Sequence, residues 1–390
     1  VRGTARLRRC RSERLTIVVQ RARAERRTVA RSTRRLRAGC RPSAPPAAPA
    51  PAGPTRVLFS TDFTPGLFGP LPQTPYPSDV DDGVAVALAL NAKALRVDGL
   101  AIQFGNNEAG PSTERARLMV HEIMGRRDIP IAKGAEAKLN PAPPSGSTDP
   151  CVNDGVRLLS RLLREGPATI VAAGPLTDVA CLARTDAEAA ANVVEILAQI
   201  GARPGEAYDL NGRPALFSLN VGVDPEATRT VLASPALAHA TIIASPYHFA
   251  GGLLLDDARV DRLGGSSPEG IWLREQAFAF RAFWRVAFGD NGLRPWDQTL
   301  VYRLMHPEAT RTVDVGWRMV DCSDPTGRNI GSACAGHGPT QFPTRDGEPQ
   351  QLWLGEGPGQ RARPHLRILS DYATPADGTR FLDAVTALRG

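Results

Sequence analysis

The N-terminal part of the sequence lacks long hydrophobic runs. Its longest apolar run, Leu15 to Val19, is shorter than the roughly 7 residues of a signal-peptide core and the roughly 18 residues of a membrane span. An ordinary export signal and a transmembrane segment are therefore not expected. The expected location is the cytoplasm.

Cysteine pairs and several catalytic signatures are also lacking. None of the six cysteines falls in a CxxC pair, so neither a zinc site nor a disulfide framework is predicted. Cys181 lies in an apolar run and is expected to be a small buried thiol. Arg37-Ala38-Gly39-Cys40 resembles a lipoprotein cleavage site with arginine in place of leucine, so export or lipid anchoring through Cys40 is the alternative location. The absence of Gly-x-Ser-x-Gly, Gly-x4-Gly-Lys-Ser/Thr and His-Glu-x-x-His argues against a serine hydrolase, a P-loop enzyme and a zincin.

Positive charge is concentrated in the first 55 residues and is scarce elsewhere. Fifteen arginines against Glu13 and Glu25 give this segment about +13, while the whole chain carries +7. The rest therefore carries about −6, which disfavours contact with a phosphate backbone. No nucleic-acid partner is expected for the folded body. A tail that tethers the body to RNA or to an anionic surface is a separate hypothesis.

Composition divides the chain near residue 54. Residues 1–54 contain a Pro/Ala stretch, Pro42 to Pro54, and lack the apolar periodicity of a folded element. We expect a disordered Arg-rich tail and linker over 1–54 and one large catalytic domain over 55–390, which is long enough to bury a substantial core. Assembly of this domain into a homo-oligomer is left open.

Short β-branched runs alternate with helical patterns after residue 55, which is typical of an α/β fold with a mostly parallel central sheet flanked by helices. The predicted strands are Val57–Ser60, Val97–Phe104, Ile129–Ala132, Thr169–Ala173, Leu216–Val221 and Thr241–Ala244. The predicted helices are Asp82–Leu90, Thr113–Met124, Val156–Leu163, Pro375–Leu388 and one that begins over Leu176–Leu182. In such sheets ligands bind outside the carboxyl ends of the strands.

Acidic residues gather at the end of the first predicted strand. Ser60-Thr61-Asp62 stands at the end of that strand, and Asp79-Val80-Asp81-Asp82-Gly83 follows after a loop. Four carboxylates here repel one another unless a hard cation joins them, and a ligand set made only of oxygen favours calcium or magnesium. Acidic residues also favour a helix N-terminus without any metal, which is the alternative. An EF-hand is excluded because Leu90 stands where that loop needs a glutamate.

These residues resemble the inosine-uridine nucleoside hydrolase family, whose first strand carries Asp-x-Asp and then an Asp pair before a helix. The subgroup with an added Asp-x before the pair fits best. Four later segments agree in order: Phe104-Gly105-Asn106, Ala173-Gly174-Pro175-Leu176-Thr177-Asp178, Phe217-Ser218-Leu219-Asn220 with Val223-Asp224-Pro225-Glu226-Ala227, and Trp296-Asp297-Gln298-Thr299. The resemblance covers about residues 56–310. It implies an enzyme that hydrolyses the N-glycosidic bond of small-molecule ribonucleosides to ribose and free base with bound Ca2+.

The resemblance also implies roles for individual residues. The implied calcium ligands are Asp62, Asp82, Asp297 and the backbone carbonyl of Thr177. Ribose hydroxyls would complete the coordination, and a calcium-bound water would be the nucleophile, with Asp62 as the base that takes its proton. Asp81 would hold the 2′-hydroxyl as positive charge develops on the sugar. Asn106 and Asn220 would hold other ribose hydroxyls.

The sequence departs from the family pattern in four places. Ser60 replaces the first aspartate of Asp-x-Asp. An insertion, Thr64 to Pro77, separates Asp62 from Asp79, so Asp79 is an alternative ligand or base. Ser218 replaces a glutamate near the ribose 5′-hydroxyl, and Trp296 replaces a histidine that protonates the leaving base in many purine-using members.

The last two departures leave the leaving-group acid and the substrate open. Trp296 can stack on a base and donate one N–H, but it cannot supply a proton. His248 is the candidate acid, although a lone histidine is more often structural. Hydrolysis of another N-glycoside or modified nucleoside, or a catalytically weakened ribose-binding protein, are the alternatives. Asp224-Pro225 is expected to begin a helix, and Asp297 could equally cap the helix after it.

Overall fold

The computed structural model divides into two compact units, Val1–Ala52 and Gly53–Gly390. It describes residues 14–21, 28–35, 53–69, 76–139, 149–203, 208–210, 213–215, 218–246, 249, 252–289, 291–321, 350–357 and 359–389. In the first unit β1 (Arg14–Arg21) pairs antiparallel with β2 (Thr28–Arg35). The disorder expected for residues 1–54 stays a prediction.

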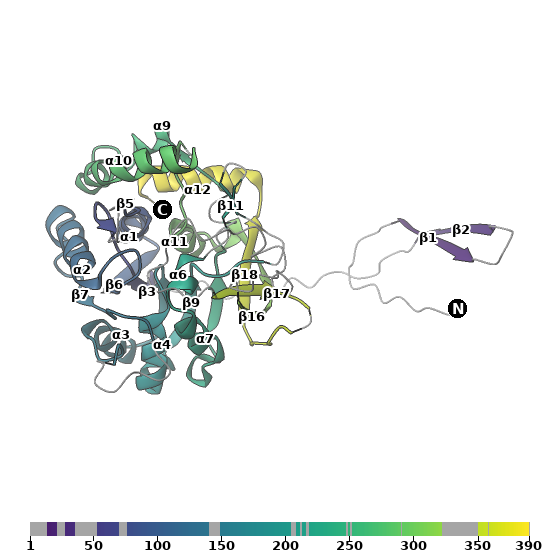
Figure 1. Ribbon diagram of the computed structural model, residues 1–390, viewed down its shortest axis with the longest axis horizontal. Helices are drawn as coiled ribbons and strands as arrows, with labels where there is room; N and C mark the ends of the chain where they lie inside the picture. Colours follow the sequence, from purple (N-terminus) through teal and green to yellow (C-terminus); the bar gives the residue numbers. More distant parts are fainter. Residues whose placement is uncertain are drawn as a thin grey trace. The chain divides into compact units, whose positions relative to one another are not determined.

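The second unit is built on an eight-stranded sheet with helices on both faces (Figure 1). In spatial order the strands are β15 (Thr310–Asp314), β18 (Leu366–Tyr372), β12 (Thr241–Ala244), β9 (Val193–Ala198), β8 (Ala168–Ala172), β3 (Thr55–Thr61), β6 (Leu95–Ile102) and β7 (Ile131–Lys133). Every pairing is parallel except that of β15 with β18. The predicted fold class is therefore confirmed.

Short strands and helices complete this unit. The further strands are β4 (Phe68–Gly69), β5 (Tyr76–Pro77), β10 (Tyr208–Leu210), β11 (Arg213–Ala215), β13 (Leu255–Asp256), β14 (Gly292–Leu293), β16 (Gly316–Asp321) and β17 (Gln350–Gly355). The helices are α1 (Asp81–Asn91), α2 (Ala109–Arg117), η1 (Leu118–Ile123), α3 (Asp154–Arg164), α4 (Thr177–Thr185), α5 (Ala187–Ala190), α6 (Leu219–Val223), α7 (Pro225–Ala233), η2 (Pro235–Leu237), α9 (Asp257–Val260), α10 (Pro268–Phe288), α11 (Gln298–Met305), η3 (Pro307–Ala309) and α12 (Pro375–Ala387). Among the described residues, none of these helices has the length and apolar character that crossing a membrane requires.

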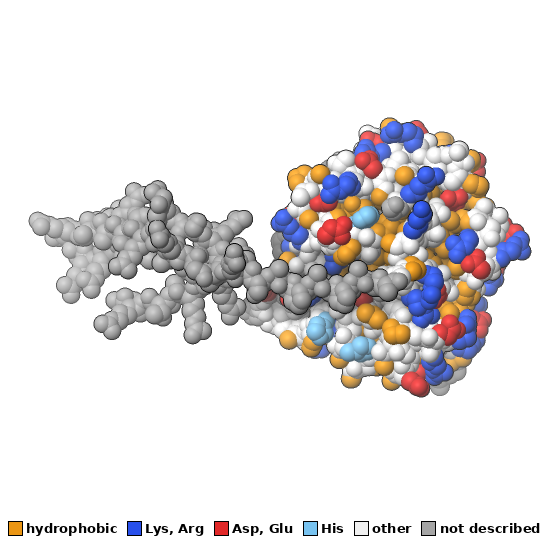
Figure 2. Space-filling view, turned by 180° about the vertical axis from the view of Figure 1, so that it is seen from behind, with side chains coloured by type: hydrophobic (Ala, Val, Ile, Leu, Met, Phe, Trp, Pro, Cys, Tyr) orange, Lys and Arg blue, Asp and Glu red, His pale blue; other side chains and the backbone are white. Residues whose placement is uncertain are grey.

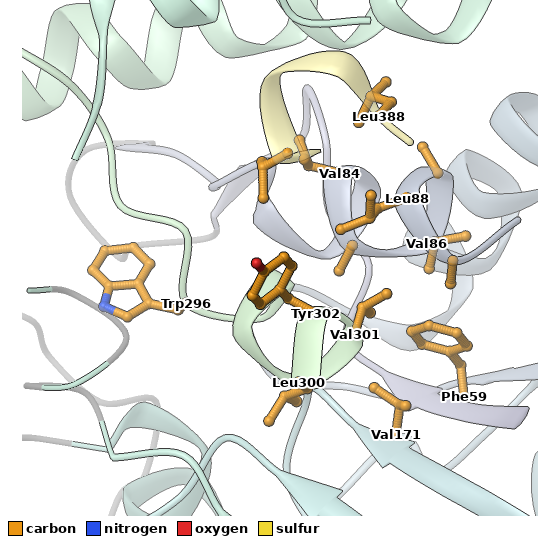
Figure 3. Packing of buried hydrophobic residues seen from close by; sticks show 14 of the residues in the cluster. Phe59, Val84, Val86, Leu88, Val171, Trp296, Leu300, Val301, Tyr302 and Leu388 are labelled. Carbon is orange, nitrogen blue, oxygen red and sulfur yellow. The ribbon is translucent and has the colours of Figure 1, made fainter. Parts of the chain in front are cut away.

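The central strand β3 is buried on both faces. Phe59 packs in one hydrophobic core with α1 and α11, whereas Leu58 packs in a second core with α3 and α4. Figure 3 shows the first core, where Leu88 of α1 lies near Val301 and Tyr302 of α11. Because successive strand side chains point to opposite faces, two cores fix the register of β3. They also fix the position of the residue that follows it, Asp62.

The predicted strand Leu216–Val221 is wrong. Its second half belongs to the short helix α6, and residues 216 and 217 lie outside the described residues. The side-chain amide of Asn220 donates to the carbonyls of Ala173 (2.6 Å) and Gln199 (3.1 Å), which follow β8 and β9. The segment therefore covers the ends of two strands instead of pairing with one. A short apolar run cannot by its periodicity distinguish these two outcomes.

Three strands of the sheet were not predicted: β9, β15 and β18. β9 lies between β8 and β12 at the centre of the sheet. Its buried residues follow a short helix with only Ala191 and Asn192 between them, which leaves no turn signal in the sequence. Most other predicted elements are present with shifted ends, and the predicted helix Thr113–Met124 is divided into α2 and the π-helical η1.

The absence of a disulfide is also a wrong prediction, because Cys151 is bonded to Cys181 (S–S 2.05 Å). The pair joins the segment before α3 to the middle of α4. Thirty residues separate the two cysteines, so no short spacing motif marks them. Both sulfurs are buried, and the packing of α3 beside α4 brings them together.

Candidate active site

Three segments bring aspartates to the carboxyl end of β3. Asp62 follows β3 directly, Asp81 and Asp82 are the first residues of α1, and Asp297 directly precedes α11. The Gln298 side-chain amide donates to the main-chain carbonyl of Asp81 (2.9 Å) and so ties the two helix starts together. Asp297 makes no side-chain capping hydrogen bond. The alternative that it caps α11 is therefore not supported.

The aspartates form one buried cluster. One carboxylate oxygen each from Asp79, Asp81 and Asp82 lie within 4.8 Å of one another. Asp62 and Asp82 are 1% exposed and Asp297 is 3% exposed, while Asp79 is half-buried. None of the ion pairs in the described part of the chain involves these five side chains. Among the described residues, none of these ion pairs therefore gives the cluster the basic partner that buried carboxylates usually have.

Burial and mutual repulsion raise the pKa values of these carboxyls. For Asp62 burial is the largest cause, repulsion from Asp81 adds to it, and the pKa rises to about 7. For Asp297 burial again leads, followed by repulsion from Asp81 and Asp82, and the pKa lies well above its ordinary value. The same two causes raise the pKa of Asp79 and Asp82. A buried cluster of carboxylates is stable only if protons or a cation neutralise its charge.

The donor set fits a hard divalent cation. Every ligand group in the cluster is a carboxylate oxygen, which suits calcium or magnesium and not a soft metal. Thr61 Oγ1 donates to Asp82 Oδ1, but Asp82 Oδ2 is buried and has no hydrogen-bond partner among the described residues. An unsatisfied buried anionic oxygen is costly. Its presence beside Asp79 and Asp81 supports a cation at this position.

Two glycines fit closely around Asp62. A Cβ added to Gly105 would lie 2.0 Å from Asp62 Oδ2, and one added to Gly174 would lie 2.9 Å from Asp62 Oδ1. The backbone N–H of Asn106 donates to Asp62 Oδ2 (2.7 Å). These contacts give a steric reason for glycine at both positions, which the sequence presented only as parts of motifs.

Gly174→Ala is expected to lower kcat/KM for a riboside by about 100-fold, because a displacement of about 1 Å at a reacting group has that order of effect. The added methyl would force the Asp62 carboxylate to move. The matched control is Gly110→Ala in α2, where an added Cβ meets nothing within 4 Å. Steady-state kinetics of both variants test this. Equal activity in the two would contradict the steric argument.

The predicted ribose-binding residues lie around this cluster. Asn106 links two aspartates, since its side-chain amide also donates to Asp79 Oδ1 (3.1 Å). Asn220 uses its amide hydrogens on main-chain carbonyls, so its Oδ1 is the atom left to accept from a hydroxyl. Ser218 is buried, and its Oγ has no hydrogen-bond partner among the described residues. Their roles toward ribose stay predictions.

Thr177 and Asp224 form a support at the start of α4. Thr177 Oγ1 donates to Asp224 Oδ2 (2.6 Å), which also accepts from the Leu139 N–H (2.7 Å). Asp224 Oδ1 accepts from the Ala227 N–H (2.9 Å), so the predicted cap of α7 is present. Asp224 therefore does more than cap a helix, because it also orients Thr177. The role of the Thr177 carbonyl as a metal ligand stays a prediction.

Trp296 is largely buried at the entrance to α11. Its ring meets Trp284 edge-on, with centroids 5.7 Å apart. Figure 3 shows the indole apart from the α1–α11 contact. A small cavity borders it and the aspartate cluster, and its lining residues are Asp79, Val80, Asp81, Val84, Leu255, Phe280, Leu293, Arg294, Trp296 and Gln298. His248, the predicted acid, lies outside the described residues.

Sequence reasoning missed two glutamines that hold the site together. Gln103 is buried at the end of β6; its Nε2 donates to Ser60 Oγ (3.2 Å) and to the Pro175 carbonyl, and its Oε1 accepts from the Asp178 N–H (3.1 Å). Gln298 is the second. Gln103 directly precedes the motif residue Phe104, and Gln298 stands within a quoted motif without an assigned role. A polar amide at the end of a buried strand was the available signal for Gln103.

An α/β sheet with a cluster of aspartates at its carboxyl edge that could hold a metal ion is an arrangement typical of metal-dependent enzymes that act on small molecules. The chain belongs to the inosine-uridine preferring nucleoside hydrolase family, whose model matches residues 77–353. The match includes Asp79, Asp81, Asp82 and Asp297, whereas Asp62 precedes it.

Individual relatives agree with this family. The pyrimidine-specific ribonucleoside hydrolases RihA of Citrobacter koseri and of Salmonella agona are each 32% identical over 173 residues, which is 40% of this chain. The chain spans about half, 54%, of the length of these curated relatives.

Solved structures share the fold. A plant nucleoside hydrolase has a TM-score of 0.62 at 20% identity, and the purine-preferring ribonucleoside hydrolase of Gardnerella vaginalis has 0.61 at 15%. Each comparison covers 86% of this chain and 99% of the other.

Proposed function

We propose that this protein hydrolyses the N-glycosidic bond of ribonucleosides, releasing ribose and the free base, with a calcium ion held by the aspartate cluster. The observation that carries the proposal is the gathering of five buried or half-buried carboxylates at the carboxyl end of β3, where burial and mutual repulsion raise their pKa values. Membership of the nucleoside hydrolase family and the names of the relatives give the substrate class.

Asp62, Asp82 and Asp297, with Asp79 as a further donor, would hold the cation together with the Thr177 carbonyl. A bound divalent cation neutralises the carboxylates, polarises the oxygens it coordinates and so eases the loss of a proton from water. Calcium is preferred over magnesium because it accepts many carboxylate oxygens in an irregular arrangement, whereas magnesium demands near-ideal octahedral geometry.

Asp62 is the proposed general base. Its carboxylate is held between Gly105 and Gly174, and the Asn106 N–H fixes one oxygen. Burial raises the pKa of Asp62 to about 7 in the metal-free protein, and a bound cation would lower this pKa and keep the carboxylate ionised, so that it could accept a proton. Proton transfer from water to Asp62 Oδ1 would leave a hydroxide. This hydroxide would attack the anomeric carbon of the ribose as the bond from that carbon to the nucleobase breaks.

Asp81, Asn106 and Asn220 are proposed to bind the ribose hydroxyls. A carboxylate at the 2′-hydroxyl stabilises positive charge on the sugar in the transition state, and neutral amides suit a neutral sugar. On the face seen in Figure 2, basic and acidic side chains are interspersed. The absence of a nucleic-acid partner for the folded body stays a prediction.

The residue expected near the 5′ end of the sugar, Ser218, favours a second candidate substrate. Ser218 Oγ is buried without a hydrogen-bond partner among the described residues, at the position where the family pattern has a glutamate. A substrate with an additional polar group at the 5′ end of the sugar would satisfy it. A modified nucleoside or another N-glycoside is therefore the alternative substrate.

The test compares p-nitrophenyl riboside, inosine and uridine, each with calcium and with EGTA. We expect release of p-nitrophenol that stops with EGTA and returns with calcium, because this leaving group needs no protonation. Turnover of the riboside without turnover of inosine would show that the ribose site works and that the protein lacks an acid for the leaving nucleobase. Calcium-dependent ribose binding with no turnover of any compound would replace the hydrolase proposal by a binding protein.

A further inference from the structure

The insertion between Asp62 and Asp79 is folded back on itself. Its arms form the antiparallel strands β4 and β5. The N–H of Ser78 donates to the Leu67 carbonyl (2.9 Å). The arm that leaves Asp62 therefore sets the main-chain position of the arm that returns at Asp79.

The Arg115 side chain fastens the outgoing arm. From α2, its Nε donates to the Pro65 carbonyl (3.1 Å), and its Nη2 donates to the Gly66 carbonyl (3.3 Å) and to Gln276 Oε1 on α10 (2.9 Å). The guanidinium also lies over the Trp272 ring, 5.6 Å from its centroid. Because the guanidinium presents several donors in a fixed plane, one side chain joins the insertion to both helices.

The sequence of the arm fits this contact. Gly66 has φ +75°, and a Cβ there would lie 1.9 Å from Gln276 Oε1 and 2.5 Å from Arg115 Nη2. Only glycine permits both this backbone conformation and this approach. The glycine therefore allows the side chains of Arg115 and Gln276 to lie directly against the main chain of this turn.

The returning arm delivers a carboxylate to the cluster. Asp79 accepts a hydrogen bond from Asn106 (3.1 Å), and a carboxylate oxygen of Asp79 lies within 4.8 Å of those of Asp81 and Asp82. A shift of the insertion would move Asp79, while Asp81 and Asp82 would stay with α1. Asp79 is the member of the cluster whose position depends on the insertion.

We propose that Arg115 is a positioning residue for the cation site, which acts through the insertion by holding Asp79 among the carboxylates. Its hydrogen bonds go to Pro65, Gly66 and Gln276 and none goes to the cluster itself. The proposal rests on the proposed function, because it requires a cation at the cluster.

The test is a double-mutant cycle of calcium affinity, measured by titration calorimetry on the EDTA-stripped full chain. Arg115→Gln is expected to raise the calcium Kd by about 10-fold, as removal of an outer support of a metal ligand does. Asp79→Asn, which removes a charged donor, is expected to raise the Kd by at least as much. The double variant is expected to match Asp79→Asn within about twofold, because both changes remove the same contribution. A purely structural role for Arg115 would lower the melting temperature and leave the Kd unchanged.

The control is Arg161→Gln on α3. Arg161 forms an exposed ion pair with Glu165 (2.9 Å) on its own helix and makes none of the hydrogen bonds that hold the insertion. This variant should bind calcium as the wild type does. If Arg115→Gln does not fold, Arg115→Lys, which keeps the charge and loses the planar fork, replaces it in the cycle. Unchanged affinity of the Arg115 variant, or losses that add in the double variant, would overturn the inference alone. A wild-type protein that binds no calcium would overturn the proposed function and the inference with it.

Discussion

Asp62→Asn is expected to lower kcat for p-nitrophenyl riboside by about 1000-fold near pH 7, within the range for loss of a positioned general base. Asparagine keeps the size of the side chain and can still accept from the Asn106 N–H, but its amide oxygen cannot take a proton from water. The measurement is kcat at saturating substrate and saturating calcium, so that a weakened metal site does not account for the loss.

Asp186→Asn is the control for that variant. Asp186 caps α5 by accepting from the Ala189 N–H (3.1 Å), and asparagine caps a helix as well as aspartate does. Its kcat should equal that of the wild type. A kcat for Asp62→Asn within about threefold of the wild-type value would remove Asp62 as the base and would favour Asp79.

Calcium is expected to raise the melting temperature much more at about pH 8 than at about pH 5. Without metal, burial first and repulsion second raise the pKa values of Asp79, Asp82 and Asp297 well above 3.8, and that of Asp62 to about 7. A carboxyl whose pKa is raised on folding contributes its full stabilisation when the pH is below its pKa in the unfolded chain. That contribution is lost as the pH rises through its pKa in the folded protein.

The metal-free protein should therefore lose stability between about pH 4 and pH 8, and calcium should restore it by replacing the lost protons. At calcium about 100-fold above its Kd the gain is about 2.7 kcal/mol, or roughly 5 °C for a domain of this size. Thermal unfolding with EDTA and with calcium at both pH values measures this. Equal melting temperatures in EDTA at the two pH values would show that the carboxyls are not coupled to folding. Asp82→Asn should reduce both the pH dependence and the calcium effect.

Local composition was sufficient for most of the sheet. The β-branched runs of β3, β6, β8 and β12 and the turns between them were readable because strands buried on both faces are continuously apolar. The prediction failed at Leu216–Val221, where the hydrogen bonds of Asn220 to the ends of two strands select a helix. It also failed for Cys151 and Cys181, whose pairing depends on how α3 packs beside α4.

The sequence by itself determined the chemistry available to the site, because carboxylate oxygens gathered at the end of a buried strand suit a hard cation. Only the tertiary structure decided which aspartates lie together and what holds them in place. Asp297 lies more than two hundred residues from Asp82 in the sequence, and their proximity follows from the packing of α1 against α11. The close fit of Gly105 and Gly174 around Asp62, and the hold of Arg115 on the insertion, are likewise contacts between distant segments. Such contacts depend on how the helices pack on the two faces of the sheet, in the two hydrophobic cores. No local pattern of residues specifies that packing.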